Sequence, residues 1–136
     1  MAKILIAEDD PLVSSFVEKR LGKEGYATQI VDDGNQATEL ALSGDFDLML
    51  LDMALPSRDG FEVLQELRRA GSLIPVIVVT GRPEMRELVA DLNVGTADFM
   101  TKPFRLDELV ARVRAHLQFQ STRAERDGEV ATPEAS

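Results

Sequence analysis

The sequence contains no cysteine and a single histidine, His116. A chain without cysteine forms neither a disulfide scaffold nor a cysteine-ligated metal site, which fits a reducing compartment. One histidine also excludes a multi-histidine site. The opening apolar run, residues 3–7, ends at once at Glu8 and is too short for a signal-peptide core or a membrane span. We therefore expect a cytoplasmic protein.

Positive charge is scarce, because 24 acidic residues face 15 lysines and arginines and the net charge is -9. Such a field repels phosphates, so we expect no direct nucleic-acid binding and no membrane contact. Cations and basic partners suit the chain better. Its 136 residues, 44% of them hydrophobic, can supply the core of one domain.

The central feature of the sequence is the run 47–52, in which four apolar residues lie between Asp47 and Asp52. A run this short predicts a strand that is buried on both faces. Asp52 would stand at the carboxyl end of that strand, the edge where ligands bind in open parallel sheets. Asp52 alone leaves two interpretations open, a chemical role and an ordinary strand end.

Short apolar runs alternate with helical spacing along the chain. Strands are predicted at residues 3–7, 28–31, 48–52, 75–80 and 97–100. Apolar residues at helical spacing predict helices around residues 13–21, 37–41, 63–67, 85–92 and 106–117, the fourth of them ending at Gly95. This alternation predicts an α/β fold, a flavodoxin-like, doubly wound, five-stranded parallel sheet with five helices in a single domain.

We place the domain at residues 1–119. Residues 120–136 show no apolar periodicity and predict a disordered tail or a linker. The sequence leaves open whether the chain is a stand-alone protein or a fragment of a longer one.

Polar side chains follow the predicted strands at their carboxyl ends: Glu8 and Asp9, Asp52, Thr80, and Lys102. A parallel sheet would gather them at one edge. Crowded carboxylates repel one another, and a hard cation with oxygen ligands, Mg²⁺, relieves that repulsion. A lysine and a hydroxyl would then suit phosphoryl oxygens. Each group also has a structural interpretation: helix-capping acids, a strand-ending threonine and a surface lysine.

From about residue 3 to residue 117 the chain resembles the receiver domain of two-component response regulators. The resemblance is carried by Glu8-Asp9, by Asp52 with Pro56 and Gly60, by Thr80-Gly81 and by Lys102-Pro103-Phe104. No one of these motifs is diagnostic, but their order and spacing together are highly specific.

The resemblance implies a role for each site residue. Asp52 would be the phosphoacceptor, and Glu8, Asp9, Asp52 and the backbone carbonyl of Ala54 would coordinate Mg²⁺. Lys102 and Thr80 would contact the acyl phosphate, and the peptide bond before Pro103 would be cis.

The implied function is phosphorelay signalling. Asp52 would receive its phosphoryl group from a sensor histidine kinase or a phosphotransfer protein, and a conformational switch would control an output partner or domain. The chain would not be an enzyme beyond catalysing its own phosphorylation and dephosphorylation. A homodimer through the fourth helix, fifth strand and fifth helix is an open alternative to an ordinary solvated face. Its candidate residues are Glu87, Asp98, Glu108 and Arg112.

Some positions depart from the family pattern or adjust it. The family resemblance makes Thr80 and Phe99 the two switch residues. Phe99 stands where the family usually has tyrosine or another aromatic residue, and it lacks the hydroxyl of tyrosine. It therefore acts through ring packing or is ordinary core. Ala54 and Arg82 occupy positions that tune phosphoryl lifetime in this family. His116 suits packing or solvent contact better than phosphotransfer.

Three other classes of protein share part of this pattern. A haloacid-dehalogenase-type enzyme would have a second acid two residues after its aspartate, where this chain has Ala54. A flavodoxin-type carrier would not have the acids Glu8, Asp9 and Asp10 where a flavin phosphate binds. The third alternative is a receiver-like interaction module that works without phosphorylation.

Overall fold

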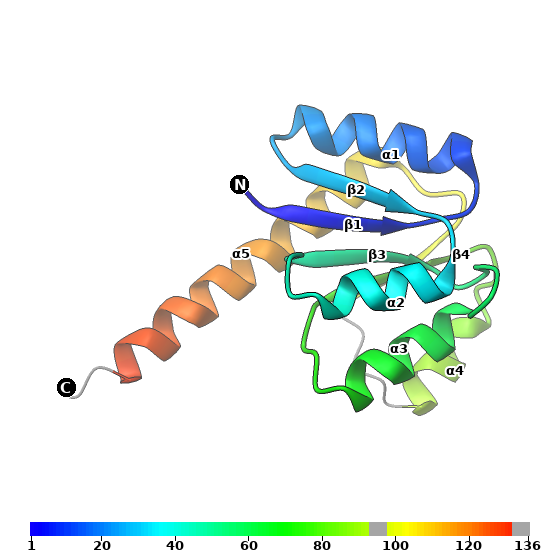
Figure 1. The fold of residues 1–136 in the computed structure, drawn as a ribbon. Helices are drawn as coiled ribbons and strands as arrows, with labels where there is room; N and C mark the ends of the chain where they lie inside the picture. Colours follow the sequence, from blue (N-terminus) through cyan, green and yellow to red (C-terminus); the bar gives the residue numbers. More distant parts are fainter. Residues whose placement is uncertain (93–97, 132–136) are drawn as a thin grey trace.

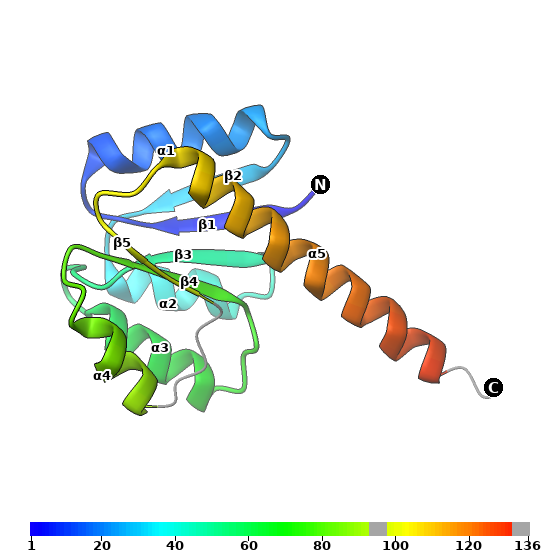
Figure 2. The ribbon, with the colours of Figure 1, turned by 180° about the vertical axis from the view of Figure 1, so that it is seen from behind.

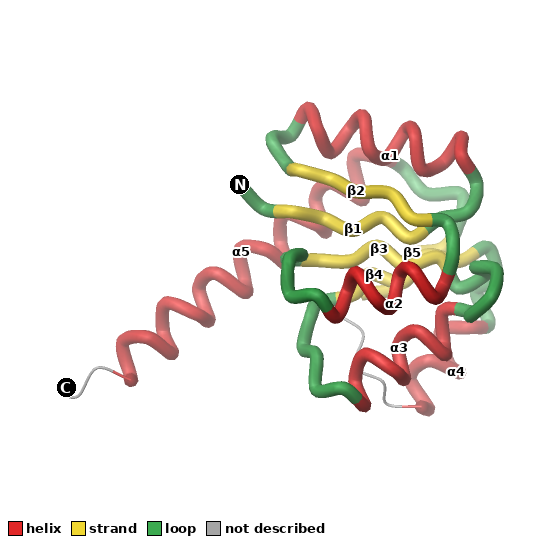
Figure 3. Tube along the Cα trace, viewed as in Figure 1, coloured by secondary structure: helices red, strands yellow, loops and turns green. Residues whose placement is uncertain are grey.

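The computed structural model describes residues 1–92 and 98–131. In this part of the chain five strands form one parallel sheet, as predicted, and their order is β2-β1-β3-β4-β5 (Figure 3). The strands are β1 (Lys3–Ala7), β2 (Ala27–Val31), β3 (Leu48–Asp52), β4 (Val76–Thr80) and β5 (Asp98–Thr101). The helices are α1 (Pro11–Lys23), α2 (Gly34–Leu42), α3 (Gly60–Arg69), α4 (Met85–Leu92) and α5 (Leu106–Ala131).

Helices cover both faces of the sheet. Figure 1 shows α2, α3 and α4 on one face, and Figure 2 shows α1 and α5 on the other. Each face has its own apolar cluster, one containing residues of α2 and α3 and the other containing residues of α1 and α5. The predicted doubly wound α/β architecture is confirmed.

Strand β3 lies at the centre of the sheet and is buried along its whole length. Met49 and Leu51 join the cluster under α2 and α3, whereas Leu48 and Leu50 join the cluster under α1 and α5. Because both faces are covered, the strand carries a continuous apolar run instead of an alternating one. Asp52 ends this buried strand, as the sequence predicts.

Aspartates begin three of the helices. The side chains of Asp10 and Asp33 accept backbone N–H groups at the starts of α1 and α2, and Asp59 does the same for α3. Glu62 completes a capping box with Asp59. These caps satisfy donors that have no partner within the helix, and they fix where each strand-to-helix loop ends.

Helix α5 differs from the sequence expectation. Disorder or a linker was predicted from residue 120, but the helix continues to Ala131 and projects beyond the sheet (Figure 1). Alanine, glutamate and arginine favour helix, and proline is absent until Pro133. Loss of apolar periodicity removes a packing face but does not by itself end a helical backbone, so the helix can continue past the predicted residue 117. The domain boundary at residue 119 and the disordered tail or linker at residues 120–136 stay predictions.

The ends of some other strands and helices differ by a residue or more from the ends that the sequence predicts. β2 begins at Ala27 and β5 covers Asp98–Thr101, while the predicted helix end at Gly95 and the strand start at residue 97 lie outside the described residues. Within residues 1–92 and 98–131, no helix has both the length and the apolar character needed to cross a bilayer.

Candidate functional site

The register of the sheet brings the predicted site residues to one edge. Ala7 pairs with Leu51, so the residues that follow them, Glu8 and Asp52, are level across neighbouring strands. On the other side of β3, Asp52 pairs with Val79, which precedes Thr80. Thr80 pairs with Thr101 in β5, and Lys102 comes next. Parallel pairing alone therefore gathers the groups that the sequence scatters over about 100 residues.

Three carboxylates meet at this edge. One oxygen from each of Glu8, Asp9 and Asp52 lies within 4.8 Å of the others. Glu8 and Asp52 are buried, at 5% and 6% exposure, whereas Asp9 is exposed. A set of carboxylate oxygens that is open to solvent on one side fits a hard divalent cation that keeps part of its water shell.

Lys102 reaches the same cluster from the β5–α5 loop. Its Nζ lies 2.8 Å from Glu8 Oε1 and 3.4 Å from Asp52 Oδ2. Burial alone would lower the pKa of Lys102, but the hydrogen bond to Glu8 and the charge of Asp52 outweigh it and raise the pKa. The amine is therefore held as a cation between two acids. The Lys102–Pro103 peptide bond is cis, which confirms the family-based expectation.

The pKa of the Glu8 carboxyl is raised by its surroundings in the cluster. Burial, followed by a hydrogen bond shared with Asp52, raises its pKa from 4.5 to about 6. The hydrogen bonds from Lys102 and from the Asp10 backbone N–H oppose that rise. The fold therefore holds Glu8 and Asp52 closer together than two ionised carboxylates prefer.

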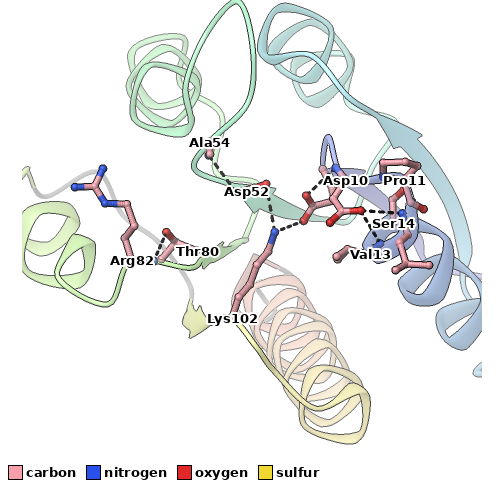
Figure 4. A network of polar contacts seen from close by, with 11 residues as sticks. Asp10, Pro11, Val13, Ser14, Asp52, Ala54, Thr80, Arg82 and Lys102 are labelled. Atoms are coloured by element: carbon pink, nitrogen blue, oxygen red, sulfur yellow. Dashed lines mark hydrogen bonds and ion pairs between the residues drawn. The ribbon is translucent and has the colours of Figure 1, made fainter.

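Thr80 lies apart from the cluster but borders the same cleft. In Figure 4, Lys102 points toward Asp52, while Thr80 lies beside the backbone of Arg82. The Thr80 hydroxyl oxygen accepts the Arg82 backbone N–H at 3.1 Å. Its own hydrogen has no acceptor among the described residues and could be donated to a ligand in the cleft. The cleft is also lined by Ala54, Asp59, Phe61, Gly81 and Met85.

The three consecutive acids after β1, residues 8–10, serve two purposes. Asp10 caps α1 through Leu12 and Val13, as the capping interpretation expects. Glu8 and Asp9 instead direct their carboxylates to the cluster with Asp52. Helix capping is therefore correct for Asp10, whereas Glu8 and Asp9 belong to the carboxylate cluster.

Ala54 follows Asp52 in the β3–α3 loop, where its backbone N–H donates to Asp52 Oδ1 at 3.1 Å. Gly60 N–H donates to the Met53 carbonyl at 3.1 Å and closes the base of the loop. Ala54 is exposed and borders the cleft. The loop thus fixes one oxygen of Asp52 and leaves the other directed toward Lys102.

Phe99 and His116 lie outside the cleft. Phe99 is buried in the cluster under α2 and α3, with the Arg86 guanidinium 4.9 Å from its ring centroid. His116 Nε2 lies 3.0 Å from Asp98 Oδ2, and Arg112 pairs with the other oxygen of Asp98. Sequence reasoning missed both the Arg86 contact and the His116 pair, because neither has a sequence signal beyond residue type.

Comparison with known proteins identifies the family. The sequence model of the response regulator receiver domain family matches residues 4–114 of the chain. The response regulator PmrA of Pseudomonas aeruginosa is 44% identical over 113 residues, which cover 83% of this chain and 51% of PmrA. A transcriptional regulatory protein of Bacillus subtilis, YkoG, is 39% identical over 125 residues, covering 92% of this chain and 55% of that protein. The chain spans about half the length of these relatives.

Solved structures agree with this assignment. A receiver domain from a Francisella response regulator has a TM-score of 0.82 at 29% identity, covering 88% of this chain and 99% of that one. The receiver domain of a sensor histidine kinase from Pseudomonas aeruginosa, described with a magnesium ion coordinated in its active-site cleft, has a TM-score of 0.76 at 29% identity. That comparison covers 86% of this chain and 98% of the other. The chain belongs to the response regulator receiver domain family, whose members act in two-component phosphorelay signalling.

Proposed function

We propose that Asp52 accepts a phosphoryl group from the phosphohistidine of a sensor histidine kinase or a phosphotransfer protein. The observation that carries this proposal is the position of the Asp52 carboxylate, which ends the central strand within 4.8 Å of Glu8 and Asp9 oxygens and 3.4 Å from Lys102 Nζ. Glu8 is also held by a backbone N–H and by Lys102, but Asp52 is the carboxylate that ends the central strand, with one oxygen fixed by the Ala54 N–H and the other facing Lys102.

Mg²⁺ is the cation that suits this site. Glu8, Asp9 and Asp52, with the backbone carbonyl of Ala54, would hold it. Their oxygens match its preference, and the burial and nearby Asp52 that raise the pKa of Glu8 support the need for a counter-charge. When bound, Mg²⁺ neutralises charge on the phosphoryl oxygens and on the carboxylates around them.

The transfer exchanges one bond for another. The P–N bond of the donor breaks and its electron pair stays on the imidazole nitrogen, while an oxygen of Asp52 forms a P–O bond. Lys102 turns its ammonium group from the carboxylates to the phosphoryl oxygens, and Thr80 donates its free hydroxyl hydrogen to the same group. The residues position and stabilise charge, which is the main contribution of proteins to phosphoryl transfer. The protein catalyses only its own phosphorylation and dephosphorylation.

Phosphorylation would then shift a conformational equilibrium. It adds roughly one to two negative charges at the end of β3. Reversing a strongly biased equilibrium requires on the order of 5 kcal/mol of differential stabilisation, so several contacts must act together. Thr80 would sense the phosphoryl group, and Phe99 would respond through ring packing against Arg86, since it has no hydroxyl.

A protein donor needs a surface beside Asp52. Val13, Phe16, Phe104 and Leu106 line an apolar groove that also contacts Lys102, and Phe16 is 56% exposed. A helical surface carrying the phosphohistidine would cover this groove and bring its imidazole to the acceptor edge. Phe16→Ser should slow phosphotransfer from a kinase while leaving phosphorylation by a small phosphodonor unchanged. Equal rates from the kinase would remove the groove from this proposal.

The output lies with a partner or a further domain. Relatives of about twice the length are transcriptional regulatory proteins. This supports control of an output partner or domain, with no direct nucleic-acid contact by the receiver itself. A homodimer through α4, β5 and α5 would be one way to transmit the switch.

The test is intact-mass spectrometry after incubation with acetyl phosphate and Mg²⁺. The parent should gain one phosphoryl group, and Asp52→Asn and a metal-free control should gain none. Asp45→Asn, an exposed acid outside the cleft, should still gain one. A folded, Mg²⁺-binding parent that gains no phosphoryl group would overturn the proposal and favour the interaction module.

A further inference from the structure

The β3–α3 loop rests on the start of α2. Gly34 N–H donates to the Pro56 carbonyl at 3.0 Å, and Arg58 N–H donates to the same oxygen at 2.8 Å. A Cβ atom on Gly34 would lie 1.8 Å from the Arg58 carbonyl oxygen, so the loop approaches this helix more closely than any side chain allows. The far end of the loop is therefore built against an element that contributes nothing to the cleft itself.

Ser57 makes the most specific of these contacts. It has a φ of +70°, and in the described part of the chain no other non-glycine residue has a positive φ. This left-handed backbone conformation costs free energy for an L residue, so it persists only where surrounding contacts stabilise it. The Ser57 hydroxyl donates to Asp33 Oδ2 and supplies that hold.

Asp33 is occupied through both oxygens. Its Oδ1 accepts the N–H groups of Asn35 and Gln36 at 2.8 and 3.0 Å, which caps α2. The Ser57 hydrogen bond, together with these N–H groups, lowers the pKa of Asp33. The carboxylate thus stays charged and joins the start of α2 to the loop.

The same loop carries Ala54 at its other end. Ala54 N–H is bonded to Asp52, and Met53 is bonded to Gly60. Between Ala54 and Ser57 lie only Leu55, which is buried, and the conformationally restricted Pro56. A displacement at Ser57 therefore has few free torsions to absorb it before it reaches Ala54.

We propose that Asp33 and Ser57 are a positioning pair that holds the β3–α3 loop with the Ala54 carbonyl toward the carboxylate cluster, and so sets the Mg²⁺ affinity of the site. The inference rests on the proposed function, in which that carbonyl is a metal ligand. Neither residue touches the metal or the phosphoryl group. Their effect passes through the backbone, as is common for residues that orient metal ligands.

The test is isothermal titration calorimetry of Mg²⁺ into the unphosphorylated full chain. Ser57→Ala removes the hydroxyl, and Asp33→Ser keeps a capping oxygen while becoming too short to reach Ser57. Each substitution should weaken Mg²⁺ binding on the order of tenfold. The double variant should bind no more weakly than the weaker single variant, because both changes remove one contact.

Ser43→Ala is the matched control, since this exposed serine donates to Leu40 at the opposite end of α2. It should leave Mg²⁺ binding unchanged. Unchanged Mg²⁺ binding in Ser57→Ala, even with a lower Tm, would overturn the proposal, and so would additive effects in the double variant. A parent that binds Mg²⁺ but forms no adduct on Asp52 would overturn the proposed function alone. A parent that binds no Mg²⁺ would overturn both.

Discussion

The Nζ atom of Lys102 lies 2.8 Å from Glu8 Oε1, and both residues line the cleft. The contact joins the end of the first strand to the loop after the last strand, 94 residues apart by number (102 − 8). It places a positive charge where the carboxylates crowd most. One cation facing two buried acids still leaves the cluster negative, and this imbalance has measurable consequences.

Replacing the phosphoacceptor should stabilise the metal-free fold. Asp52→Asn keeps the shape of the side chain and removes the charge that crowds Glu8. We expect the free energy of unfolding to rise by about 1 kcal/mol at neutral pH. Urea denaturation in a metal chelator measures this, with Asp45→Asn as the control. A larger loss of stability in Asp52→Asn than in Asp45→Asn would contradict the expected repulsion.

Glu8 should give stability a distinct pH dependence. Its pKa is about 6 in the folded protein and 4.5 ordinarily, so the folded state takes up the proton first as the pH falls. The metal-free parent should therefore gain roughly 2 kcal/mol relative to Glu8→Gln as the pH falls from above 6 to below 4.5. Denaturation midpoints across this range measure the gain. Parallel curves for the two proteins would show that Glu8 titrates normally.

The close approach at Gly34 should be intolerant of a methyl group. Gly34→Ala forces the new Cβ against the Arg58 carbonyl, and we expect a loss of about 2 to 3 kcal/mol. Gly22 lies in α1 with no atom within 4 Å of its Cβ position, so Gly22→Ala should stabilise by about 0.5 to 1 kcal/mol. Denaturation of both variants measures the contrast. Equal effects would mean that the loop moves away without cost.

Ala54 should control how long the phosphoryl group lasts. It is exposed beside Asp52, and Ala54→Asn would place an amide where it can hydrogen-bond an attacking water. We expect dephosphorylation to accelerate on the order of tenfold. The decay of the adduct, followed by mass spectrometry, measures the rate. Ala70→Asn, at the exposed C-cap of α3, serves as the control, and matching decay rates would remove Ala54 from phosphoryl lifetime.

A homodimer through the α4, β5 and α5 face would need Arg112 to exchange partners. Within the chain, Arg112 pairs with Asp98 and with Glu108 at 3.6 Å. We expect beryllofluoride and Mg²⁺ to shift the parent to dimer in sedimentation velocity, and Arg112→Ala to remain monomeric. Arg114→Ala should still dimerise, since Arg114 pairs with Glu24, which follows the end of α1. Dimerisation of both variants would exclude this face.

The sequence predicts both the sheet and the acidic cluster, because short apolar runs mark buried parallel strands and the acids follow directly after those runs. A strand such as residues 48–51 is apolar throughout when both faces of the sheet are covered, and parallel strands end at one edge of the sheet. The Asp98–His116 pair could not be predicted, because it depends on side-chain directions across two elements. The positive φ of Ser57 was equally hidden, since Pro56-Ser57 signals a turn without its conformation.

The long α5 has a mechanical consequence. Leu109, Val110 and Val113 fix its base in the apolar cluster under α1 and α5. Asp107 and Arg114 add ion pairs to Arg20 of α1 and to the C-cap residue of α1. At 26 residues it is about 39 Å long, so tilting the base by about 10° would sweep the far end through about 7 Å. The helix is a lever arm, and small rearrangements near β5 would be magnified at its tip.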